Sequence, residues 1–293
     1  MSYSNQKKGM LIAFTGIMFI TPDSLLIRLS DLESWNLIFY RGLVPFLVVF
    51  FGLLIIYKKK IFSEILNNGW HGFAYACVFT ITNIVFIISI ENTTAANTLI
   101  MIALAPMLSA VISFVFLKEN PDKKTWLAIV ITTLSVIYIF SDTLDTGDFF
   151  GSFLGLVTAT GLAVGAVIIR SAKKISLVPS AMVGKFMVSI VALVILMMSP
   201  DFFIGQLKLK GSDIGIIPLM CIMCVAIPFV LVTLAPRYIT AAEVNLFFLL
   251  ETILGPLWVW LVIKEQPSFE TIIGGVIIIL TIATHSILAL KKN

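Results

Sequence analysis

The chain contains one pattern twice. The stretch TAA at residues 94–96 leads through an apolar run to KENP at 118–121, and TAA at 240–242 leads through a second apolar run to KEQP at 264–267. Both ends of the match fall at an offset of 146 residues, about half of the 293-residue chain. A match without gaps across this distance indicates a duplicated unit.

The composition indicates that the chain is a membrane protein. Hydrophobic residues make up 59% of the chain, charged residues 12%, and the mean hydropathy is +1.06. Ten segments of about 17–23 residues are apolar and long enough to cross a bilayer core of about 30 Å. The predicted spans are 9–28, 36–57, 70–90, 94–117, 125–141, 150–169, 180–199, 213–236, 241–263 and 269–289. The eighth contains three prolines and is the least regular, and a count of eight or nine spans is the alternative.

The placement of Lys and Arg predicts the orientation. On the ten-span reading, fourteen basic residues lie on one side of the membrane and four on the other. The first set is Lys7, Lys8, Lys58, Lys59, Lys60, Lys118, Lys123, Lys124, Arg170, Lys173, Lys174, Arg237, Lys291 and Lys292, and the second is Arg28, Lys208, Lys210 and Lys264. Because basic loops stay in the cytoplasm, both termini are predicted to be cytoplasmic, with 58–69 and 171–178 inside and 142–149 outside. The pI of 8.9 is explained by this bias and does not indicate nucleic-acid binding.

The repeat divides the chain into a first unit, 1–148, and a second, 149–293. Arg28 aligns with Arg170 at an offset of 142, which also aligns Asp23 with Gly165, and Arg41 falls near Lys185 at 144. Each unit then has five spans. Because five is odd, the second unit must enter the membrane from the opposite side. The predicted fold is therefore all-α, with ten transmembrane helices in two inverted-topology five-helix repeats, an architecture typical of secondary transporters.

The segment from Leu104 to Glu119, an apolar run around Pro106 that closes on a Glu, resembles the fourth-helix signature of the drug/metabolite transporter superfamily, EamA type. Arg41 in FYRG is similar to the family's second-helix arginine. The second copy departs from the pattern, because Glu251-Thr252 stands where Pro is expected. The resemblance implies a ten-helix transporter of small organic solutes, such as amino acids, their metabolites or amphipathic toxic compounds.

Glu251 is the strongest candidate for a substrate or coupling site. It lies near the middle of the ninth span, where an ionised side chain costs about 2.5–3.5 kcal/mol on insertion scales. The aligned residue of the first repeat is Ala105, so packing shared by the repeats does not require an acid. Three- and four-residue spacing places it on one face with Asn245, Phe248 and Thr252. We expect it to bind a substrate amine or a proton; interhelical hydrogen bonding is the alternative.

Asp23 and Arg41 are the second case. Each lies about six residues from the outer end of its span, roughly 9 Å deep, so the two can pair. The alternative is a fixed ion pair that never meets substrate. Lys185 and Glu243 take mirror positions near the inner face as gating candidates, although Lys185 is better explained by extension of its side chain to the headgroups.

Other polar groups in the spans are weaker candidates. Asn83 in the third span and Asn97 in the fourth are amides that either line a cavity or bridge helices. Tyr40 and Tyr75 are the aromatic residues expected at a cavity. Gly165 aligns with Asp23 and, because it has no side chain, leaves space at the position where the first repeat has a carboxylate.

The sequence contains few motifs that would indicate another class of function. The chain has no phosphate-binding glycine loop and no HExxH, and Cys221 and Cys224 lie in an apolar span without the setting of a redox pair. We therefore expect no enzyme, metal or cofactor. The expected function is secondary transport, as an exporter of small metabolites, in a bacterial-type inner membrane. The expected partners are a small-molecule substrate, the bilayer and protons, with a monomer or homodimer both open. A lipid or lipid-linked carrier is the runner-up, followed by an intramembrane enzyme and a receptor or scaffold.

Overall fold

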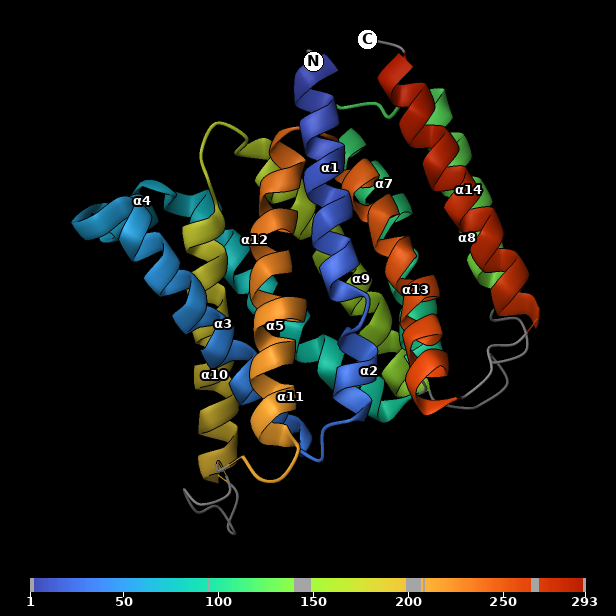
Figure 1. The fold of residues 1–293 in the computed structure, drawn as a ribbon. Helices are drawn as coiled ribbons and strands as arrows, with labels where there is room; N and C mark the ends of the chain where they lie inside the picture. The colour runs from blue at the N-terminus through green and yellow to red at the C-terminus, as the bar shows by residue number, and fades with distance from the viewer. Residues whose placement is uncertain are drawn as a thin grey trace.

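The protein is a bundle of helices, shown as a ribbon in Figure 1. The computed structural model describes residues 3–93, 95–139, 149–198, 207, 209–264 and 269–291. The elements are α1 (Tyr3–Ile20), α2 (Asp23–Arg28), α3 (Ser34–Tyr57), η1 (Lys58–Lys60), α4 (Ile61–Asn67), α5 (Gly69–Asn92), α6 (Ala95–Ile102), α7 (Ala105–Leu117), α8 (Lys123–Ile139), α9 (Phe149–Ser171), α10 (Val178–Met198), α11 (Asp213–Leu219), η3 (Met220–Ala226), α12 (Ile227–Leu234), η4 (Ala235–Arg237), α13 (Ala241–Ile263) and α14 (Phe269–Lys291).

Helices occupy each of the ten predicted segments, and seven stretches of the described chain are long and apolar enough to cross a membrane. The seven are Asn5–Arg28, Ser34–Tyr57, Gly69–Asn92, Phe149–Ser171, Val178–Met198, Asp213–Arg237 and Ala241–Val262. Ala105–Leu117 and Ile272–His285 are shorter apolar helices. The protein therefore has a multispanning membrane fold, while the count of ten stays a prediction.

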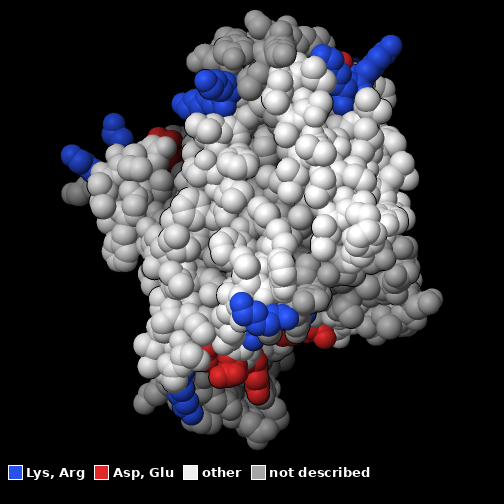
Figure 2. Space-filling model, turned by 45° about the vertical axis from the view of Figure 1, so that its right-hand side comes forward, with Lys and Arg blue, Asp and Glu red and all other residues white. Residues whose placement is uncertain are grey.

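The surface has the character of a lipid-facing belt. Large apolar side chains such as Ile55 and Phe116 are more than two-thirds exposed. In Figure 2 a wide band without charged side chains separates Lys and Arg at one end of the molecule from basic and acidic groups at the other. The start of α1 and the end of α14 lie at the same end of the bundle (Figure 1). Residues 142–148, which belong to the segment predicted to be extracytoplasmic, are not among the described residues.

Repeat-related helices α3 and α10 pack against one another and run in opposite directions. A Cβ atom added to Gly42 would lie 2.6 Å from the backbone nitrogen of Ser189. One turn further along α3, the ring of Phe46 lies 4.8 Å from that of Phe186, one turn earlier in α10. The absence of a side chain at Gly42 therefore lets two backbones meet at the centre of an antiparallel pair.

The repeat is also visible where α7 and α13 end. Lys118 and Lys264, aligned at the offset of 146, both cap their helices in the left-handed region, with φ of 53° and 67°. Glu119, just after α7, shares a surface pocket with Thr240 at the start of α13. The end of one helix thus lies beside the start of its repeat mate, as an inverted pair requires.

Proline explains where the spans are interrupted. Pro106 stands in the first turn of α7, and the chain leaves helical geometry between α6 and α7. Its aligned residue Thr252 keeps its backbone N–H, and α13 is continuous. In the eighth segment, η3 is a π-helix between Pro218 and Pro228, which confirms the irregularity expected there.

The contact of α3 with α10 gives a first prediction. Gly42→Ala should lower stability by about 1–3 kcal/mol, because its Cβ would meet backbone atoms of Lys185 and Ser189 that cannot move alone. Gly52→Ala on the same helix is the control, since a Cβ there meets nothing within 4 Å. Thermal unfolding in detergent measures both. Equal midpoints for the two variants would contradict the close contact.

Candidate functional site

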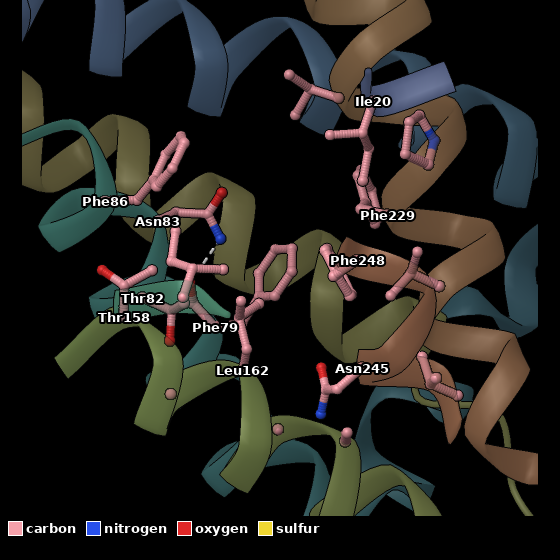
Figure 3. Close-up of a pocket in the computed structure, with 18 of the residues that line it drawn as sticks. Ile20, Phe79, Thr82, Asn83, Phe86, Thr158, Leu162, Phe229, Asn245 and Phe248 are labelled. Atoms are coloured by element: carbon pink, nitrogen blue, oxygen red, sulfur yellow. Dashed lines mark hydrogen bonds between the residues drawn. The ribbon is translucent and has the colours of Figure 1, made fainter. Parts of the chain in front are cut away.

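A cavity of about 160 Å³ lies between the two halves of the chain. Its wall takes residues from α1, α2, α3, α5 and α6 in the first half and from α9, α10, η3, α12, η4 and α13 in the second. Figure 3 shows Phe79, Phe229 and Phe248 and the amides of Asn83 and Asn245 around this space. The polar and charged lining residues are Asp23, Arg41, Tyr75, Thr82, Asn83, Thr158, Lys185, Asn245 and Glu251. The cavity is thus apolar with a few convergent polar groups, as small-molecule sites usually are.

Asp23 and Arg41 form a bidentate ion pair. Arg41 Nη1 donates to Asp23 Oδ1 at 2.6 Å and Nη2 donates to Oδ2 at 2.7 Å. The residues are 3% and 8% exposed. Planar guanidinium and carboxylate groups matched in this way are the strongest form of charge-assisted hydrogen bond. The pairing expected from their equal depth is confirmed, and a role in substrate binding stays a prediction.

The break before α2 places the aspartate. Pro22 has no N–H to give to the carbonyl of Met18, and the hydroxyl of Thr21 donates to that carbonyl at 2.9 Å instead. Trp258 Nε1 donates to the same hydroxyl at 2.9 Å and ties the break to α13. The chain then forms α2 from Asp23 onward, and the Asp23 side chain reaches Arg41 of α3.

Lys185 lies inside the bundle. It is 1% exposed, and its Nζ donates to Asn83 Oδ1 at 2.5 Å and sits 5.2 Å from the centre of the Phe79 ring. Asn83 is held in turn, because its Nδ2 donates to the carbonyl of Phe79 at 2.7 Å (Figure 3). The expectation that Lys185 extends to the headgroups is wrong. Its ammonium is directed into the cavity, where α5 supplies an amide and an aromatic face.

Four of the described residues of α13 line the cavity, Val244 and the three named next. Asn245, Phe248 and Glu251 all line it, three residues apart. Glu251 has no hydrogen bond or ion pair within the described part of the chain. Thr252, expected on the same face, is instead buried, and its hydroxyl donates to the carbonyl of Leu249. The rotation of α13 about its axis therefore places Glu251, and not Thr252, at the cavity.

Other predicted residues lie elsewhere. Tyr40 is not among the described lining residues; its hydroxyl donates to the carbonyl of Leu207. Glu243 is the third residue of a capping box, and accepts from the backbone N–H and hydroxyl of Thr240 at 2.7 and 2.8 Å. Asn97 belongs to α6, and its side chain lies outside the described residues. Neither Tyr40 nor Glu243 is thus among the described lining residues: Tyr40 binds the chain at Leu207, and Glu243 stabilises the start of α13.

The aromatic residues Phe79 and Phe229 of the cavity wall were not anticipated. Tyr75 was expected, and its hydroxyl lies 3.0 Å from that of Thr233. The Phe79 ring stands 5.6 Å from Tyr75 and 5.9 Å from Phe229, so α5 and α12 meet through aromatic contacts. A signal for Phe79 exists in the sequence, because it lies four residues from both Tyr75 and Asn83 on one helical face. Phe229 has no such signal.

The ion pair gives a second prediction. Asp23→Asn should lower stability by about 3–5 kcal/mol, because Arg41 is left as a buried charge without its partner. The exchanged double variant Asp23→Arg/Arg41→Asp should recover part of that loss, whereas Asp31→Asn in an exposed turn should change little. Thermal unfolding of wild type, Asp23→Arg, Arg41→Asp and the double variant provides the thermodynamic cycle. A double variant no more stable than the sum of the single changes would exclude a direct interaction.

Comparison with known proteins agrees with this architecture. A crystal structure described only as that of a protein superimposes with a TM-score of 0.77, at 15% sequence identity, and covers 97% of this chain and 99% of its own. This likeness shows the fold alone. No curated protein matches the sequence. The EamA-like transporter family matches residues 7–141 and again 149–287, nearly the whole chain in two repeats, and the protein therefore belongs to that family of membrane transporters.

Proposed function

We propose that the protein is a secondary transporter that exports small organic metabolites, such as amino acids or their derivatives, across a bacterial-type inner membrane. The observation that carries the proposal is a cavity with charged groups at the interface of two repeats whose helices run in opposite directions. In such an arrangement the repeats exchange conformations, and the site between them faces each side in turn. Ten spans and cytoplasmic termini are part of the proposal.

Alternating access requires that contacts between the halves open and close at each end. At one end, Arg170 Nε in the last turn of α9 donates to Glu119 at 3.0 Å, and Arg170 Nη1 donates to the carbonyl of Pro236 at 3.3 Å. These contacts join the end of α7 in the first half to α9 and η4 in the second. The cavity can open widely at this end only after they separate.

Glu251 is the group in the cavity that is best suited to a substrate amine or a proton. It lines the wall without a hydrogen-bond partner in the described residues, unlike Asp23, whose two oxygens are taken by Arg41. An intramembrane acid left in this way is a functional candidate. Proton antiport through Glu251 and uncoupled movement of solute are both compatible with this position.

A carrier of lipids or lipid-linked molecules is the second candidate. An apolar groove on the outside of α5 and α9 is lined by Ile81, Phe153 and Val157, and it shares Thr82 and Gly161 with the wall of the cavity. A path through this groove would connect the cavity to the bilayer. Movement of a fluorescent phospholipid between the leaflets of proteoliposomes, in the absence of solute transport, would favour this candidate.

The role of Glu251 gives a third prediction. Glu251→Gln keeps size and most hydrogen-bonding capacity but removes the charge, so uptake of radiolabelled solute by proteoliposomes should fall at least about tenfold while thermal stability stays near wild type. Glu91→Gln, at the exposed end of α5, is the matched control and should transport normally. Wild-type rates in a folded Glu251→Gln protein between pH 6 and 8 would leave this residue a packing role only.

The orientation gives a fourth prediction. In a background without Cys77, Cys221 and Cys224, Ser212→Cys should react with an impermeant maleimide on intact cells, whereas Lys60→Cys should react only after lysis. Both positions are exposed. The basic loop that contains Lys60 stays in the cytoplasm by the positive-inside rule. Reaction of Lys60→Cys and protection of Ser212→Cys in intact cells would invert the topology.

A further inference from the structure

The two repeats place a cation at matching positions but supply only one with an acid. Arg41 of α3 aligns with Lys185 of α10, and both line the cavity. Arg41 is paired through both terminal nitrogens with Asp23. The residue aligned with Asp23 in the second repeat is Gly165, so Lys185 has no equivalent carboxylate within its own repeat.

Lys185 is left with unused hydrogen-bonding capacity. Its ammonium has three N–H donors, and the contacts that the described residues provide are one neutral amide oxygen, from Asn83, and one aromatic face, from Phe79. An ammonium that is 1% exposed needs an opposite charge to be held favourably in an apolar bundle. A ligand that brings a carboxylate would meet this need.

Space for such a group exists where the acid is missing. A Cβ added to Gly165 would find only the ring of Tyr75 within 4 Å, at 3.4 and 3.8 Å, which is ordinary contact. Gly165 and Lys185 line the same cavity.

A second donor is also unpaired. Asn245 is 1% exposed, and its Nδ2 has no hydrogen-bond partner. In Figure 3 its amide points from α13 toward the α9 ribbon. An N–H group buried without an acceptor is costly, so an acceptor on the ligand would be stabilised there.

We propose that the cavity binds a substrate carboxylate, held by Lys185 Nζ in the space that Gly165 leaves, where it takes the place of the acid absent from the second repeat, and that a separate acceptor of the ligand engages Asn245 Nδ2. The inference rests on the proposed transport function and specifies its substrate class as organic carboxylates. Glu251 lines the same cavity and is available to an amine, so an amino acid would engage both Lys185 and Glu251.

The first experiment supplies the missing acid within the protein. Gly165→Asp should pair with Lys185, raise the thermal midpoint relative to the isosteric Gly165→Asn, and lose that advantage in a Lys185→Met background. An equal midpoint for the Asp and Asn variants, or an advantage that persists without Lys185, would contradict the pairing.

The second experiment uses three probes that share an apolar body: L-leucine, 4-methylpentanoate, which lacks the amine, and 3-methylbutylamine, which lacks the carboxylate. Thermal shifts should reveal binding of the two carboxylates, weakened at least about tenfold by Lys185→Met and also by Gly165→Asp. Lys210→Met, on an exposed loop, is the control for charge. This experiment decides the question even if Gly165→Asp does not fold.

The outcomes separate this inference from the proposed function. Absence of a Lys185-dependent shift with either carboxylate overturns the inference. Flux in proteoliposomes of a solute that lacks a carboxylate, unaffected by Lys185→Met, overturns it as well while leaving transport intact. Lys185-dependent binding of carboxylates without any flux would support the inference and contradict transport.

Discussion

The ion pair between Arg41 and Asp23 is the interaction on which the arrangement of the site depends. A guanidinium cannot lose its charge in a protein, so a bundle surrounded by lipid must supply it with a counter-charge from within. The carboxylate that does so stands at the start of α2, directly after Pro22, because α1 ends at Ile20 before this proline. The break between α1 and α2 thus allows a buried charge on α3, and the resulting ion pair joins α2 to α3.

The second constraint is the close approach of α3 and α10. Without a side chain at Gly42, the backbones of repeat-related helices meet near the centre of the bundle, and Arg41 and Lys185 are carried to the same cavity. The duplicated scaffold is therefore symmetric in its cations. It is asymmetric in its acids: Asp23 has Gly165 as its counterpart, and Glu251 has Ala105. A symmetric scaffold does not require these differences. Asp23 is used by Arg41, and the ligand contacts proposed above are therefore at Lys185 and Glu251.

Part of this arrangement follows from the sequence because it depends on distance along a helix. The depth of Asp23 and Arg41 below one interface is set by 1.5 Å per residue, and their pairing follows from equal depth and opposite charge. The same reasoning failed for Lys185. A long side chain can extend toward the headgroups or turn inward, and only the position of Asn83 and Phe79 on a neighbouring helix decides between the two. The face of α13 was also ambiguous, since Glu251 and Thr252 both fit a spacing of three or four residues from Phe248, and the rotation of the helix against its neighbours placed only Glu251 at the cavity.

The sequence by itself determined the apolar helical character and the duplication, because hydrophobic length and repeated sequence are properties of the chain alone. The antiparallel contact of α3 with α10 agrees with the opposed direction that the predicted span count implies. The breaks beside Pro22 and Pro106 interrupt two segments that were each predicted as one span, whereas Pro45 lies inside the continuous helix α3. The tertiary structure alone decided which side chains share the cavity. Phe229 of α12 contacts Phe79 of α5, although more than half of the chain separates them in sequence. Tyr40 is adjacent to Arg41 in sequence, but its hydroxyl binds the carbonyl of Leu207. Such choices depend on how helices rotate about their axes when they pack, and apolar spans with little amphipathic pattern do not record that rotation in their sequence.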